Sequence, residues 1–296
     1  LYRPIQQVEQ IVWDYIRPVL SIKEYFFAPS EHMLRIEKVG SEIHLTEILP
    51  DDKQVIFGVR PCDARGLLAL DALFLEDQPA DVYYARRRAN TILVGLACLA
   101  PGPTCFCTRM GGALDDPTGM DVMLYPQEDQ FVVRALTSKG KTLLKNWGID
   151  APLEPAASTP LTPHIPEIDA WPPHFDDAFW QQFSERCLSC RACSYVCPTC
   201  RCFDVRDEPV RTEDGSQVFD RIRCWDACAG EPYRRVAGGH NPRPEKGMRL
   251  RNRFYCKFYY YPQQYGPLAC TGCGRCVESC PVNVDITEVL DYMVRR

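Results

Sequence analysis

The chain has 296 residues, of which 46% are hydrophobic and 25% charged, and its net charge is -5. That length is enough for about two domains with hydrophobic cores. The negative charge argues weakly against general affinity for nucleic acid. The longest uncharged apolar stretch, residues 91–100, is about half as long as a bilayer span requires, so no transmembrane helix is expected.

Seventeen cysteines are far more than an ordinary cytoplasmic protein carries unless most of them bind metal. A disulfide framework is the alternative, but it is typical of small secreted chains that lack a core. The first ten residues contain early charges and no apolar segment of the secretory type. We therefore expect a cytoplasmic protein in an anaerobic or strongly reducing environment.

The amino-terminal half shows the pattern of an α/β domain. Residues 54–59 and 91–96 are short apolar runs that resemble buried strands, and residues 63–76 between them have helical spacing of leucines. This order predicts a parallel strand-helix-strand unit. Residues 121–125 and 131–136, joined by a polar turn, predict a hairpin at the edge of the sheet.

Four cysteines follow the two predicted parallel strands, at the edge where open α/β sheets bind ligands. They are Cys62, Cys98, Cys105 and Cys107. We infer that these four residues hold a third 4Fe-4S cluster, besides the two predicted below. The alternative is that they are buried apolar cysteines. Cys-x-Cys spacing alone is not diagnostic, so the inference depends on the number of cysteines at one edge.

Residues 151–173 contain seven prolines and predict a stiff, extended linker. This linker divides the chain into an α/β domain over residues 1–150 and a second domain over residues 174–296. Helices are expected over residues 176–186 and 285–295, the latter with Ile286, Val289, Leu290 and Met293 on one face. We predict that the second domain is an α-helical, two-cluster 4Fe-4S ferredoxin-like domain with a long insertion over residues 203–269.

Two cysteine runs of the bacterial ferredoxin type frame that insertion. They read Cys187-Leu-Ser-Cys190-Arg-Ala-Cys193-Ser-Tyr-Val-Cys197-Pro198 and Cys270-Thr-Gly-Cys273-Gly-Arg-Cys276-Val-Glu-Ser-Cys280-Pro281. In two-cluster proteins the fourth cysteine of each run binds the cluster of the other run. The rule predicts one 4Fe-4S cluster on Cys187, Cys190, Cys193 and Cys280, and a second on Cys270, Cys273, Cys276 and Cys197. Structural zinc is disfavoured, because it prefers paired Cys-x-x-Cys knuckles.

Further cysteines lie just before and within the insertion, which also contains a basic, aromatic segment. Cys200, Cys202 and Cys228, together with Cys224, could form another metal site, or they could be buried thiols that hydrogen-bond to a neighbouring cluster. The segment over residues 233–265 combines arginines and lysines with tyrosines and phenylalanines. Such a mixture can bind single-stranded nucleic acid, but it can equally offset the negative charge of a cluster. His240 lies in a turn sequence, where a histidine more often caps the backbone than binds metal.

Several longer sequences resemble a known family, the iron-sulfur subunits represented by the anaerobic sulfite reductase A subunit and the sulfhydrogenase beta subunit. The resemblance rests on Phe57-Gly-Val-Arg-Pro-Cys-Asp63, Cys105-Phe-Cys-Thr-Arg-Met-Gly111, Cys197-Pro-Thr-Cys-Arg-Cys-Phe-Asp204, Trp225-Asp-Ala-Cys228, Gly239-His-Asn-Pro-Arg243 and Lys257-Phe-Tyr-Tyr-Tyr-Pro262. Cys224 and Cys256 are not expected in the family. The resemblance implies a subunit that passes electrons between a flavoprotein binding FAD and NAD(P) and a catalytic hydrogenase or sulfite reductase subunit.

The chain has no Gly-x-Gly-x-x-Gly, phosphate loop or haem-attachment sequence, so nucleotide and substrate chemistry are expected on partner subunits. We predict a non-catalytic electron-transfer subunit of a multi-subunit oxidoreductase. The alternative is an iron-sulfur protein that senses redox state and binds nucleic acid through the basic insertion.

Overall fold

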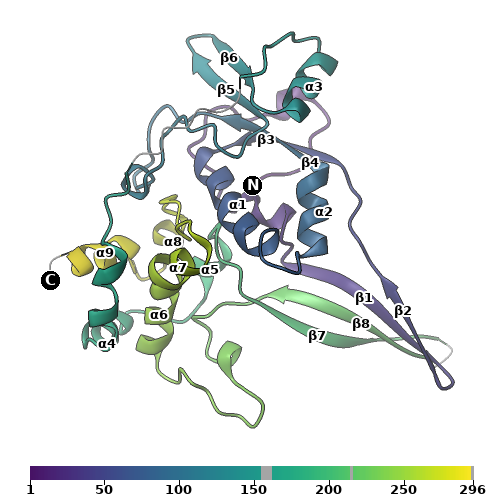
Figure 1. The fold of residues 1–296 in the computed structure, drawn as a ribbon, viewed down its shortest axis with the longest axis vertical. Helices are drawn as coiled ribbons and strands as arrows, with labels where there is room; N and C mark the ends of the chain where they lie inside the picture. Colours follow the sequence, from purple (N-terminus) through teal and green to yellow (C-terminus); the bar gives the residue numbers. More distant parts are fainter. Residues whose placement is uncertain (155–161, 214–215, 295–296) are drawn as a thin grey trace.

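The computed structural model describes residues 1–154, 162–213 and 216–294. Figure 1 shows two sheets and a group of short helices. Part of the predicted linker, residues 155–161, and the last residue of the second predicted helix lie outside the described residues. Among the described residues, no helix is long and apolar enough to cross a membrane.

The first sheet has the strand order β3-β4-β5-β6 and contains β3 (Gln54–Val59), β4 (Thr91–Leu96), β5 (Val122–Gln127) and β6 (Gln130–Ala135). β3, β4 and β5 are parallel, and β6 pairs antiparallel with β5. The predicted parallel strands and the edge hairpin are thus confirmed. The helices of this half are α1 (Pro61–Phe74), α2 (Val82–Asn90) and α3 (Ser138–Asn146).

Helix α1 determines where the first cysteine of the sheet edge lies. Pro61 occupies the first turn, where its missing N–H removes no hydrogen bond, so the helix starts one residue before Cys62. Leu67, Leu70 and Phe74 on its buried face pack into a core with Ile56 and other apolar side chains of the sheet. Burial of each such side chain contributes about 1.5–3 kcal/mol. Because β3 and α1 both contribute side chains to this core, the position of Cys62 in the first turn of α1 is fixed.

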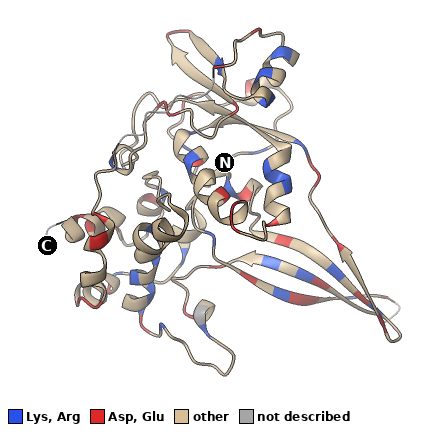
Figure 2. Cartoon of the chain, in the orientation of Figure 1, with Lys and Arg blue, Asp and Glu red and all other residues tan. Residues whose placement is uncertain are grey.

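The second sheet, which we call the arm, was not predicted. It has the order β2-β1-β8-β7 and contains β1 (Ser30–Val39), β2 (Glu42–Glu47), β7 (Phe203–Val210) and β8 (Gln217–Trp225). All its pairs are antiparallel. The arm projects from the body at the lower right of Figure 1. Charged side chains of both signs lie along its strands (Figure 2), with pairs such as Arg221 Nε to Asp207 Oδ1 at 2.7 Å.

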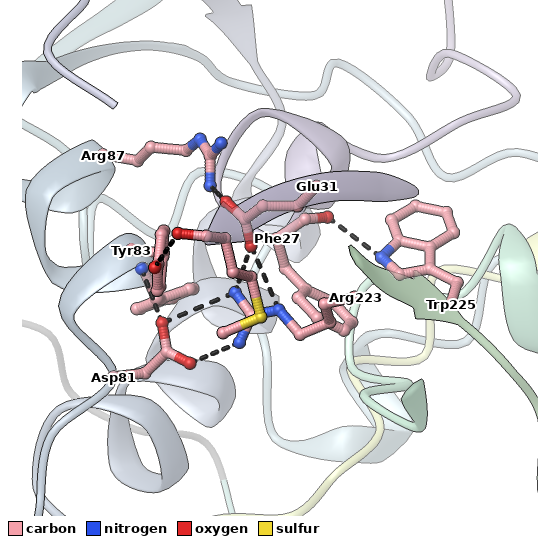
Figure 3. Close-up of polar contacts among 9 residues, drawn as sticks. Phe27, Glu31, Asp81, Tyr83, Arg87, Arg223 and Trp225 are labelled. Atoms are coloured by element: carbon pink, nitrogen blue, oxygen red, sulfur yellow. Dashed lines mark hydrogen bonds and ion pairs between the residues drawn. The ribbon is translucent and has the colours of Figure 1, made fainter. Parts of the chain in front are cut away.

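A buried ion network fixes the base of the arm, as Figure 3 shows. Arg223 of β8 donates from Nε to Glu31 Oε2 of β1 over 3.0 Å and also pairs with Asp81 at the start of α2. Arg87 of α2 forms a further ion pair with Glu31. The indole nitrogen of Trp225 donates to the Phe27 carbonyl over 3.0 Å. Strands from both sides of the predicted linker are therefore joined in one sheet and to the α/β half.

Short helices carry the two ferredoxin-type runs. These are α4 (Phe179–Ser184), α5 (Ala192–Tyr195), α6 (Lys246–Tyr255), a π-helical turn (Cys256–Tyr260), α7 (Tyr261–Tyr265), α8 (Arg275–Glu278) and α9 (Ile286–Val294). Short 3-10 helices cover Val8–Gln10, Ile22–Tyr25, Thr108–Met110, Ile168–Ala170, Pro172–His174 and Pro232–Arg234. The predicted apolar face of α9 is confirmed, since its four side chains are buried against Trp180, Phe183 and Phe254.

Candidate metal centres

The first thiol group consists of Cys187, Cys190, Cys193 and Cys280, which line one pocket. Apolar side chains of α6 and α9, including Phe254 and Ile286, complete its walls. Backbone amides point at two of the sulfurs: Ser189 N lies 3.4 Å from Cys187 Sγ, and Val284 N lies 3.2 Å from Cys280 Sγ. The pocket thus brings Cys280, the fourth cysteine of the second run, beside three cysteines of the first run, and Cys276 also lines it.

The second thiol group consists of Cys270, Cys273, Cys276 and Cys197. Burial raises the pKa of Cys270 to about 11 and that of Cys276 to about 12, and the nearby Cys197 sulfur acts in the same direction on both. Burial also raises the pKa of Cys273. Burial therefore disfavours the thiolate form of these three side chains, and a metal bound to them would have to stabilise that form.

The third thiol group consists of Cys62, Cys98, Cys105 and Cys107, and all four line a second pocket. Cys62 lies in the first turn of α1 and Cys98 follows the end of β4, so the carboxyl ends of two adjacent parallel strands bring them together. The Cys105-Phe106-Cys107 loop closes the opposite side of the pocket. Cys273 of the second thiol group lines the same pocket.

The loop of the third group packs directly on the second cysteine run. Phe106 N donates to Gly272 O over 2.8 Å, and Arg17 Nε donates to Cys273 O over 2.5 Å. A Cβ atom on Gly272 would lie 2.6 Å from Cys107 Cα, and one on Gly274 would lie 2.1 Å from Thr104 O. Both glycines also have positive φ. Only glycine fits at these positions, since a side chain would separate the two backbones.

An ion pair between the two halves lies beside these groups. Arg275 Nη1 is 2.7 Å from Asp63 Oδ1, and Arg275 Nη2 is 2.8 Å from Asp63 Oδ2. Asp63 is fully buried and Arg275 is 1% exposed. The pair is bidentate, which is the strongest arrangement of these two side chains. It links Cys62 of the third group to the Cys273–Cys276 segment of the second.

Buried cations face the sulfurs of the second group. Lys257 Nζ lies 3.2 Å from Cys197 Sγ and 2.9 Å from Ala269 O. Burial alone would lower the pKa of Lys257, but the sulfurs of Cys197 and Cys200 raise it above its ordinary value. Arg253 is also buried and donates to the Cys193 carbonyl over 3.2 Å. Positive charge at these positions favours thiolates and the negative charge of a cluster.

Several aromatic residues of the insertion are internal, as are Arg249 and Arg253. Phe254, Tyr255, Phe258 and Tyr261 are each no more than 2% exposed. They pack with Trp171, Trp180 and neighbouring rings, so their faces are not open for stacking on nucleic acid bases. His240 is exposed in a turn, where its carbonyl accepts a hydrogen bond from Val236 N.

The five remaining cysteines divide into two environments. Cys200, Cys202, Cys228 and Cys256 lie together beside the second group. Cys224 lies apart on β8, with its sulfur 3.6 Å from Ser30 Oγ. Among the residues that the structure describes, no three His, Cys, Asp or Glu side chains converge closely enough for a single metal ion. The thiol groups instead surround pockets or lie side by side.

Sequence reasoning did not assign a role to Asp63 or Arg275, and it considered Lys257 only as one of the basic residues of the insertion that can offset the charge of a cluster. A usable signal was nonetheless present for two of them. Asp63 directly follows Cys62, and Arg275 directly precedes Cys276, so each charge is adjacent to a predicted ligand. Lys257 had no such signal, because it comes close to Cys197 only through the packing of the helical segment from Lys246 to Tyr265.

Residues 186–284 match a protein family described as a 4Fe-4S dicluster domain, which defines the class of protein as iron-sulfur. The chain is 34% identical over 307 aligned positions to the sulfhydrogenase 2 subunit beta of Pyrococcus furiosus, with 98% of this chain and 87% of that protein covered. The chain therefore belongs to the family of sulfhydrogenase beta subunits. No solved structure matches it.

Proposed function

We propose that the chain is the electron-transfer subunit of a multi-subunit oxidoreductase, and that the three thiol groups each hold one 4Fe-4S cluster. The family membership and the dicluster domain support the two clusters of the ferredoxin-type runs. The four cysteines around one pocket at the sheet edge support the third. Such clusters, when bound, accept and release one electron at a time.

The observation that carries this proposal is the continuity of the three groups. Cys273 of the second group also lines the pocket of the third group. Cys276 of the second group also lines the pocket of the first group. The second group is therefore the central one, and electrons would cross the chain from the third group to the first or in reverse.

We propose that one end of this path meets a flavoprotein that binds FAD and NAD(P), and that the other meets a catalytic hydrogenase or sulfite reductase subunit. The name of the similar protein, a sulfhydrogenase subunit, supports a hydrogenase. Cys190 is exposed and Leu188 is 63% exposed, so the first group is open to contact by another protein. The chain's residues bind the clusters and offset their charge, and substrate chemistry belongs to the partners.

Iron content tests the proposal directly. Protein purified without oxygen should contain at least about eight irons per chain for the first two groups and about four more for the third. Electron paramagnetic resonance of the reduced protein should show interacting clusters. Fewer than about eight irons in a fully loaded sample would exclude the proposed function.

The crossed ligand sets make a second test possible. Cys197→Ala should damage the cluster of the second group, whereas Cys280→Ala should damage that of the first, although each residue belongs to the other run in sequence. Cys224→Ala is a suitable control, because its sulfur lies on the arm next to Ser30. The reverse pattern of damage would show that each run binds its own cluster.

A further inference from the structure

Four cysteines outside the three groups come together although they are far apart in sequence. Cys200 and Cys202 follow the first run, and β7 begins at Phe203. Phe203 pairs with Trp225 across the β7–β8 ladder, and Asp226 N donates to Cys202 O over 2.9 Å. This pairing brings Cys228, just beyond β8, next to Cys202.

Cys202 and Cys228 form a side-chain hydrogen bond, and the sulfurs of Cys200 and Cys256 lie near Cys228. The hydrogen bond with Cys202 raises the pKa of Cys228, and burial and the nearby sulfurs of Cys200 and Cys256 act in the same direction. Cys256 lies in the π-helical turn after α6, and Arg201 Nη2 lies 3.4 Å from its sulfur. Cys228 is buried, and the other three are partly buried. A π-turn inside a helix is frequently found at functional sites.

The surroundings of the set suit an anionic group. Lys23 is 2% exposed, and its Nζ donates to the Cys200 carbonyl over 3.1 Å. Its ammonium also lies over the Trp225 ring, 3.7 Å from the ring centroid. Arg201 is held between two elements, because its guanidinium lies 3.8 Å from the centroid of the Tyr261 ring. The set therefore has one cation from the amino-terminal segment and one from the segment that follows the first cysteine run.

Cys224, which the sequence suggested as a member, does not belong to this set. It pairs across the arm with Ser30 of β1 and Asp204 of β7. Cys256 takes its place, although it is 28 positions after Cys228. This exchange leaves four thiols in one place, the number that a 4Fe-4S cluster requires.

We propose that Cys200, Cys202, Cys228 and Cys256 bind a fourth iron-sulfur cluster, adjacent to the second thiol group. Cys200 forms a side-chain hydrogen bond with Cys197, so the fourth site touches the central group of the path. The electron-transfer path would then branch at the second group, with one branch to the first group, one to the third and one to the fourth. Only this branching rests on the proposed electron-transfer function, since cluster binding can be tested without it.

The experiment compares metal and sulfide content in protein purified without oxygen. The wild type should contain about sixteen irons and sixteen acid-labile sulfides per chain, and Cys228→Ala and Cys256→Ala should each lose about four of both. Cys224→Ala serves as the matched control and should lose none. Retention of the other signals in electron paramagnetic resonance shows that each variant is folded.

Three results would overturn the proposal. The first is a fully loaded wild type with about twelve irons or fewer, which remains decisive even if a variant fails to fold. The second is zinc at the site in place of iron. The third is a Cys202–Cys228 disulfide found by thiol labelling of the protein as isolated without oxygen. A count of about twelve irons would remove only the fourth site, and a count of about eight would also remove the third cluster. Either count leaves the proposed electron-transfer function intact.

Discussion

The two ferredoxin-type runs have the same cysteine spacing and the same backbone turns, but they differ in what lies against them. Ser189 and Arg191 in the first run adopt positive φ, as do Gly272 and Gly274 at the matching positions of the second run. The first run can carry side chains in this costly conformation because its loop faces outward. The second run cannot, because the loop from Thr104 to Cys107 lies against it.

The same cysteine pattern is therefore found in two different environments, one buried and one exposed. Residues 271–275 of the second run are all buried, whereas Leu188 and Cys190 of the first run are exposed. A buried cluster is shielded from solvent and fixed relative to its neighbours, while an exposed one can exchange electrons with another protein. Comparable substitutions in the two runs should therefore have unequal effects on stability, iron content, cluster potential and electron exchange.

The largest difference between the two runs is expected in the stability that is lost when the ion pair beside each run is broken. Asp63→Asn leaves the buried Arg275 charge without its partner, so we expect a loss of about 3–5 kcal/mol of stability. Glu288→Gln removes the partner of the exposed Arg186, which lies 2.7 Å away, and should cost less than about 1 kcal/mol. Denaturant unfolding of the loaded protein under anoxic conditions measures both. Equal losses of stability in the two variants would contradict the view that the second run is buried and the first exposed.

The glycine substitutions should give the next largest effect. Gly274→Ala forces a Cβ against the Thr104 carbonyl at positive φ, and we expect a cost of about 2–3 kcal/mol together with iron loss from the third group. Ser189→Gly at the first run should change stability by less than about 1 kcal/mol. Iron content and melting temperature report the two outcomes. A Gly274→Ala protein with full iron content would show that the loops need not touch.

Removal of single lysines tests the charge around each run. Lys257→Met takes away a buried cation 3.2 Å from Cys197 Sγ. Reduction adds negative charge, so the potential of the second cluster should fall, by on the order of 50 mV, about a tenfold change for one electron. Lys246→Met near the first run should shift its cluster less, because Lys246 is exposed and screened by solvent. Redox titration followed by electron paramagnetic resonance compares them.

The smallest effect is expected at the surface of the first run. Leu188→Ser should leave iron content unchanged but slow electron exchange with a partner protein by a few-fold, because it removes exposed apolar contact beside Cys187. Leu45→Ser on the arm is the control, since Leu45 is 62% exposed and Leu188 is 63% exposed. Stopped-flow reduction of the partner measures the rates. A similar slowing in both variants would exclude a specific role for the first run.

The parts of this fold that depend on local pattern were predictable from the sequence. Strands β3 and β4, the β5–β6 hairpin and the apolar face of α9 each follow from the periodicity of a short segment. The arm did not, because β1 pairs with β8 residues that are as many as 194 positions away, and neither strand alternates cleanly. Cys256 was missed for the same reason, since its neighbours come from other elements.

The pairing of β1 with β8 also has a consequence for synthesis of the protein. Glu31 is buried against Arg223, which lies 192 residues later in the chain. At a translation rate of about 5–20 residues per second, the ribosome needs about 10–40 s to make that stretch. Until Arg223 emerges, the base of the arm lacks its central cation. Strand β1 therefore cannot pair with β8 during this time. Most of the cysteines have already been synthesised before the four-stranded arm can form.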